Sequence, residues 1–77
     1  MTQEEVRTLK VGDLVTWNDP DNGAITLEVV IENDCNPEDI YVQLRTIAVL
    51  KDPDDELDVG DDGWIHNHNC DHLEMVA

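Results

Sequence analysis

The chain has 77 residues, and its 19 Asp and Glu against four Lys and Arg give a formal net charge of −15 at pH 7. A chain of this length allows one small domain, residues 1–77, and leaves little room for a closed substrate pocket. Its charge repels nucleic acid, phosphate-rich substrates and anionic membranes, and it attracts cationic proteins. Composition therefore predicts a protein that binds a basic partner and does not catalyse a reaction.

Apolar residues make up 40% of the chain, which is too much for a disordered acidic tail and predicts a folded domain. No stretch approaches the roughly 20 apolar residues of a membrane span, and the first ten residues lack the apolar run of a secretion signal. We therefore expect a cytoplasmic protein. Cys35 and Cys70 are too few for a disulfide framework and are expected as free thiols.

The N-terminal half predicts a helical turn followed by a hairpin. Thr2-x-x-Glu5 has the form of a capping box, and the helix that it begins must be short because Gly12 interrupts it. Residues 14–17 are typical of a strand. Residues 18–23, with the sequence NDPDNG, then form a dense turn signal.

The run from Ile25 to Glu32 alternates with period two and predicts a strand with one wet face. We expect its more apolar side to face the core, and Glu28 and Glu32 to lie on the solvent side. With two residues of the following strand, the predicted core is Ile25, Leu27, Val29, Ile31, Val42 and Leu44.

A second turn cluster covers residues 33–39, and period two resumes at Ile40. Residues 47–50 are apolar on both faces, which indicates either a doubly buried strand or a bulge near Thr46 that swaps its faces. Residues 51–63 form an acidic loop, a further strand begins at Trp64, and a short apolar segment closes the chain. Turns at these intervals favour a small antiparallel barrel.

The segment VGDLVTW (residues 11–17) resembles the first strand of small SH3-like barrels of the Tudor and KOW type. The segment HLEMV (residues 72–76) is similar to their ending, a single helical turn that leads into a short last strand. The resemblance implies an all-β fold: a small antiparallel SH3-like barrel of four to five strands with a short N-terminal helical turn. It implies no activity, since this architecture carries many unrelated functions.

The stretch from Trp64 to His72 contains the strongest candidate for metal chemistry. In one straight strand, the side chains of His66, His68, Cys70 and His72 would share a face. Four such ligands would span about 20 Å, so no more than two adjacent ones could bind a single ion. Cys35 or an acid would then have to complete the ligand set. A surface strand with imidazoles packed beside Trp64 is the preferred interpretation. The acidic loop lacks the glycine that an EF-hand needs, because Leu57 occupies that position. We predict no metal and no cofactor.

Nucleophilic catalysis finds little support in the sequence. Ser is absent, which excludes a serine nucleophile. Cys70 and His72 could act as a thiol and its base, but nearby acids raise a thiol pKa and disfavour the thiolate.

Seven acids within residues 52–62 point to a directed negative surface, and Trp64 is a candidate aromatic anchor. The predicted partner-binding residues are Asp52, Asp54, Asp55, Glu56, Asp58, Asp61, Asp62, Trp64, Glu28 and Glu32. The function expected of them is nucleic-acid mimicry: binding the cationic groove of a DNA- or RNA-binding, host-defence type protein and blocking it. In overall character the chain resembles phage-encoded anti-restriction and anti-CRISPR proteins, which implies the host-cell cytoplasm if a phage encodes it. The alternative is an SH3-like protein-protein interaction module or structural subunit whose acidic surface reflects its habitat.

Overall fold

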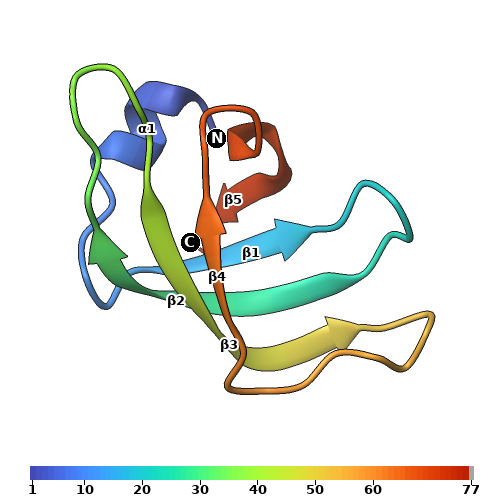
Figure 1. The fold of residues 1–77 in the computed structure, drawn as a ribbon. Coiled ribbons are helices and arrows are strands. Elements are labelled where there is room, and N and C mark those ends of the chain that lie inside the picture. Colours follow the sequence, from blue (N-terminus) through green and yellow to red (C-terminus); the bar gives the residue numbers. More distant parts are fainter. Residues whose placement is uncertain (77) are drawn as a thin grey trace.

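Five antiparallel strands dominate the computed structural model, which describes residues 1–76; Ala77, the last residue of the predicted domain, lies outside the described residues. The strands form one sheet in the order β4-β3-β2-β1-β5 (Figure 1). The elements in chain order are α1 (Gln3–Arg7), β1 (Leu14–Asn18), β2 (Ile25–Asn33), β3 (Val42–Lys51), β4 (Asp62–Ile65), the 3₁₀ turn η1 (Cys70–His72) and β5 (Leu73–Met75). The predicted β-rich fold with a short N-terminal helix is confirmed, but no pairing among residues 1–76 joins β4 to β5, so the sheet is open there.

Helix α1 begins at the capping box that the sequence predicts. The Thr2 hydroxyl accepts a hydrogen bond from the Glu5 amide at 3.2 Å, and the Glu5 carboxylate accepts one from the Thr2 amide at 2.9 Å. These two bonds satisfy amides that have no partner inside the helix. The short helix buries Val6 in the core and therefore covers one face of the sheet.

The β1–β2 connection is the hairpin turn that the sequence predicts. The Gly23 amide donates to the Asp19 carbonyl at 3.0 Å, and the Asp19 carboxylate accepts from the Asp21 amide at 2.8 Å. Gly23 has φ of 75°, a conformation that an L side chain rarely adopts. The turn therefore depends on the Asn-Gly pair that marks it in the sequence.

The predicted faces of β2 are wrong. Thr26, Glu28 and Val30 point into the core side, while the more apolar set is only half-buried on the outer side; that set is Ile25, Leu27, Val29 and Ile31. The neighbouring strand decides the outcome, because Val30 is paired with Leu44 and Glu28 with Thr46, and these β3 residues face the core. Val42 and Leu44 are buried as predicted. Alternation alone shows that a strand has two faces, but it does not show which of them α1 and η1 cover.

Strand β3 contains a bulge near Thr46, one of the two alternatives that its apolar run left open. Thr46 is paired with Glu28 and Ala48 with Leu27, so Ile47 is the extra residue on β3. Two further irregularities in the β2–β3 pairing lie beside Leu50 and Ile31. A bulge bends and twists a strand, which fits the strong curvature of β2 and β3 in Figure 1.

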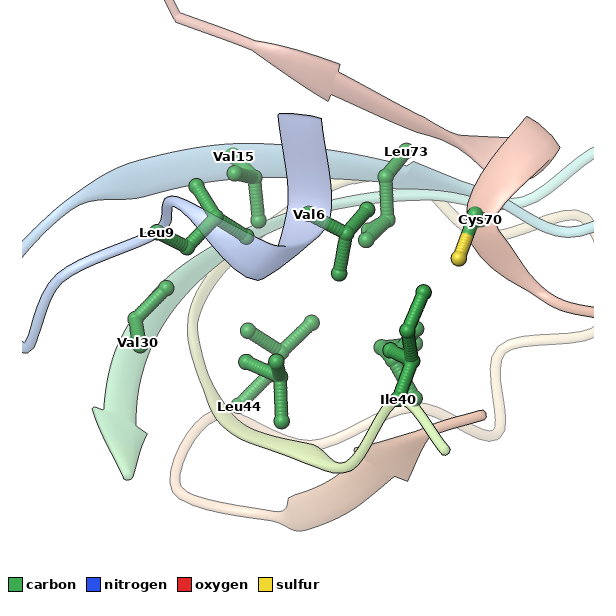
Figure 2. Close-up of a cluster of buried hydrophobic side chains, with 10 residues drawn as sticks. Val6, Leu9, Val15, Val30, Ile40, Leu44, Cys70 and Leu73 are labelled. Carbon is green, nitrogen blue, oxygen red and sulfur yellow. The ribbon is translucent and has the colours of Figure 1, made fainter. Parts of the chain in front are cut away.

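One hydrophobic core lies on the inner side of this curved sheet (Figure 2). Its buried members are Val6, Leu9, Val15, Val30, Ile40, Val42, Leu44, Ile65, Cys70 and Leu73. Ile65 comes from β4 and Leu73 from β5, the two edges of the sheet. Because both edges supply residues to the same core, the sheet must curl around it.

Candidate partner-binding surface

The acidic loop and the β1–β2 turn lie side by side at one end of the molecule (Figure 1). The loop between β3 and β4 covers residues 52–61, slightly less than the predicted 51–63. The Asn22 side-chain amide donates to the Asp54 carboxylate at 3.0 Å and joins the two segments. The turn brings Asp19 and Asp21 next to the loop, so the negative surface is larger than the loop alone.

Backbone and side-chain hydrogen bonds hold the loop in place. The Asp52 carboxylate accepts from the Leu57 amide at 2.9 Å. At the other end, the Gly60 amide donates to the Thr46 carbonyl at 2.7 Å, and the Thr46 amide donates to the Asp61 carbonyl at 2.9 Å. The side chains that these bonds leave at the surface are Asp54, Asp55, Glu56, Asp58 and Asp61. A fixed loop presents its charges with little ordering cost on binding.

Asp62 differs from the other predicted acids because it is paired. The Arg45 guanidinium donates from Nε to Oδ1 at 2.8 Å and from its terminal nitrogen to Oδ2 at 3.1 Å. This fork holds the pKa of Asp62 below its usual value, chiefly through the hydrogen bonds from Arg45. Asp62 is therefore less available to a partner than the unpaired loop acids. The sequence offers no signal for this pair, because β3–β4 pairing alone brings the two residues together.

Glu28 and Glu32 do not share the solvent face on which they were predicted. Glu28 is buried on the inner side of β2 with 8% of its surface exposed, while Glu32 lies exposed near the end of the strand. The irregularity at Ile31 separates them, since Glu32 is paired with Gln43 on the outer side. The nearby Asp34 carboxylate raises the pKa of Glu32. Only Glu32 can therefore contribute to an outer acidic surface.

Burial raises the pKa of Glu28, and the charges of Asp61 and Asp62 raise it further, while hydrogen bonds from Thr46 and Thr26 oppose the shift. A raised carboxyl pKa means that the folded state is favoured while Glu28 is protonated. This stability is complete below the ordinary value of 4.5 and is lost as pH rises through the raised pKa.

Glu28→Gln is therefore expected to be more stable than the natural protein at about pH 7, by about 1 kcal/mol, because the amide carries no buried charge. At about pH 3.5 both side chains are neutral and the difference should disappear. Urea unfolding of both proteins at the two pH values measures this. Glu74→Gln, a matched change at an exposed acid, should show no such gain. A variant that is less stable than the natural protein at about pH 7 would contradict the assignment.

Trp64 is half-buried on β4 at the end of an aromatic row. Its ring lies 4.1 Å from that of Tyr41, measured between centroids and tilted by 30°. Tyr41 also contacts His66 at 4.9 Å, and His66 stacks on His68 at 6.3 Å. These neighbouring rings hold the Trp64 side chain in place, and its role as an interface anchor stays a prediction.

The predicted strand from Trp64 to His72 ends at Ile65, so the imidazoles and the thiol do not share a strand face. Cys70 is buried in the core, and the His72 ring stands edge-on to Trp17 at 5.4 Å, while His66 and His68 extend the aromatic row. Burial raises the pKa of the Cys70 thiol, which disfavours the thiolate. Within residues 1–76, no three His, Cys, Asp or Glu side chains gather as ligands of one ion.

Two hollows contain residues that sequence reasoning missed. The larger, about 600 Å³, lies beside Tyr41 and His66 and includes Asp34 and Asp39. The smaller, about 220 Å³, is lined by Trp17, Glu28, Leu44, Gly63, Trp64, Ile65 and Asn69. The signal for the smaller one is Glu28, an acid in the middle of β2 that the sequence predicts on the solvent face and that the structure buries.

Comparison of the chain with protein-family models, with curated proteins and with solved structures finds no match. Among the described residues, no helix has the length and apolar character needed to cross a membrane. The function therefore has to be argued from the geometry of this surface.

Proposed function

We propose that this protein mimics nucleic acid: its acidic end occupies the cationic groove of a DNA- or RNA-binding protein and blocks it. The proposed activity is binding, without catalysis or a cofactor. The predicted surface is revised in two respects. The β1–β2 turn adds Asp19 and Asp21 beside the loop, and Glu28 leaves the outer surface.

The observation that carries the proposal is the contact between Asn22 and Asp54, which places two acidic chain segments next to each other. An extended chain advances about 3.4 Å per residue, close to the spacing of phosphates along one DNA strand. Acids on alternate residues of an extended chain therefore supply about half of the charge density of one DNA strand. A second acidic segment beside the first brings the charge density up to that of the DNA strand. The loop and the β1–β2 turn are not extended, but they gather the acids of two chain segments at one end of the molecule, which raises the local density of negative charge.

The fold supports a finer proposal, an SH3-like barrel of the Tudor and KOW type. Gly12 and Asp13 precede β1, and η1 leads directly into β5, as in the family that the sequence resembles. A cytoplasmic location, and a role like that of phage-encoded inhibitors of restriction or CRISPR systems, belong to the same proposal. Their support is the chain's small size and net charge of −15.

Competition is the test of this function. A pull-down from host lysate first supplies the basic partner, which is then titrated with labelled nucleic acid at fixed ionic strength and several concentrations of this protein. We expect the apparent Kd for nucleic acid to rise in proportion to the concentration of this protein. If nucleic acid and this protein bind the partner together, with no change in either Kd, mimicry is refuted.

The outer face of the sheet favours the second candidate, an interaction module or structural subunit. This face carries half-buried Leu27, Val29 and Ile31, and the exposed fractions of Leu14 and Ile47 reach 38% and 40%. Apolar side chains gathered on one face are typical of protein contact sites. Binding without competition would favour this function.

A further inference from the structure

The smaller hollow, which we call the Glu28 pocket, lies on the inner side of the sheet, beside the β4 residues that follow the acidic loop. Its polar lining comes from Glu28 on β2 and Asn69 before η1, and its aromatic side chain is Trp17 on β1. Gly63, Trp64 and Ile65 of β4 form the opposite wall, and the Trp64 ring itself lies on the outer face beside Tyr41. Strands β1 and β4 are not neighbours in the sheet, so the pocket exists only because the sheet curls.

One oxygen of Glu28 has no hydrogen-bond partner among residues 1–76. The Oε2 atom is buried, although 8% of the residue as a whole remains exposed. Thr26 and Thr46 lie beside the carboxyl group, and neither donates to this atom. A buried polar atom without a partner destabilises the fold, and more so when it is charged. A cation that pairs with the Glu28 carboxylate from the pocket offsets this cost.

Charge and aromatic surface around this oxygen select a cation. Asp61 and Asp62 lie close enough to add negative potential at Glu28. Trp17, one of only three Phe, Trp and Tyr residues in the chain, lines this pocket. Indole rings attract cations through the negative face of their π system. The edge-on contact with His72 holds the Trp17 ring in place before a ligand arrives.

The volume indicates a single side chain. At about 220 Å³ the Glu28 pocket is smaller than the roughly 300–1,000 Å³ of most cofactor and drug sites. Among basic side chains, arginine fits this lining best, because its planar guanidinium stacks on aromatic rings while it donates hydrogen bonds in its own plane.

We propose that the Glu28 pocket receives one arginine side chain of the partner, with the guanidinium pairing with the Glu28 carboxylate and contacting the Trp17 ring. The proposal rests on the proposed function for the basic partner, but the pocket's preference for arginine can be measured without that partner. It gives the acidic end a specific anchor in addition to its long-range charge.

The test is an NMR titration of the isotope-labelled protein with the peptide acetyl-Gly-Arg-Gly-amide. We expect a shift of the Trp17 indole N–H signal, and a Kd at least about tenfold lower than for the matched peptide with citrulline, which keeps the shape and lacks the charge. Glu28→Gln should raise the Kd for the arginine peptide by about tenfold or more. Glu74→Gln, the matched change at an exposed acid, should leave it within about twofold. Melting of each variant confirms its fold.

Equal binding of the arginine and citrulline peptides by the natural protein would overturn the proposal, and so would a Glu28→Gln variant that binds the arginine peptide as tightly as the natural protein does. Tighter binding of the corresponding lysine peptide would refute the assignment to arginine. These outcomes are independent of the competition experiment. If the pocket binds arginine but nucleic acid is not displaced from the partner, the proposed function is wrong and the proposal of an arginine pocket is still valid.

Discussion

Leu44→Ala is expected to lower the free energy of unfolding by about 2–5 kcal/mol, because it removes a side chain from the centre of the core and leaves a cavity. Leu44 is 2% exposed and is paired with Val30, which is fully buried. Small domains are stabilised by only about 5–15 kcal/mol in total. Urea unfolding, monitored by tryptophan fluorescence, should show a large shift of the midpoint or a chain that does not fold.

Leu27→Ala is the matched control, because it deletes the same atoms on the outer face of the adjacent strand. Leu27 is half-buried, so we expect a loss of about 1 kcal/mol, well below that of Leu44→Ala. The two variants together determine which face of β2 and β3 holds the core. A larger loss for Leu27→Ala than for Leu44→Ala would show that the described faces are wrong.

Neutralising the acidic loop is expected to slow association with the basic partner by about tenfold or more at low salt. The variant carries Asp54→Asn, Asp55→Asn, Asp58→Asn and Asp61→Asn. Asp52 and Asp62 are kept because they bond the Leu57 amide and Arg45. Charge at an exposed interface acts mainly on the association rate and is screened by salt. Surface plasmon resonance at about 50 mM and about 500 mM salt should show the difference at low salt and a much smaller one at high salt.

A control variant removes four exposed acids elsewhere: Glu4→Gln, Glu38→Gln, Asp71→Asn and Glu74→Gln. It has the same net charge as the loop variant but keeps the acidic end intact. Its association rate should stay within about threefold of that of the natural protein. Equal slowing in both variants would mean that total charge alone governs binding and that the acidic end is not a directed surface. The loop variant should be at least as stable as the natural protein, because mutual repulsion of the loop acids is relieved.

Local sequence signals predicted most of the elements. The capping box at Thr2 and Glu5, the Asn-Gly turn, the alternation from Ile25 and the acidic loop all appear in the structure near their predicted bounds. The apolar run after Thr46 left a doubly buried strand and a bulge open, and the structure has the bulge. The capping box and the Asn-Gly turn depend on interactions between residues close in the chain, which a sequence displays directly.

The face of β2 and the geometry of the candidate site were decided by contacts between distant segments. Alternation predicts a strand with two faces, but the choice between them is made where α1 and η1 cover the sheet, and this buries Glu28 and leaves Leu27 half-buried outside. The bend at residues 66–72 likewise separates side chains that a straight strand would have placed together.

The sequence by itself determined the charge and the concentration of acids in one loop, and the proposal of a basic partner follows from these two features. Only the tertiary structure joined Asn22 to Asp54, paired Arg45 with Asp62 and gathered Trp17, Glu28 and Trp64 around one pocket. These residues lie on different strands or loops, far apart in the chain, and they meet because bulges and a shared core make the sheet curl. Strand pairing and curvature arise from many simultaneous long-range contacts, and no local pattern in the sequence encodes them.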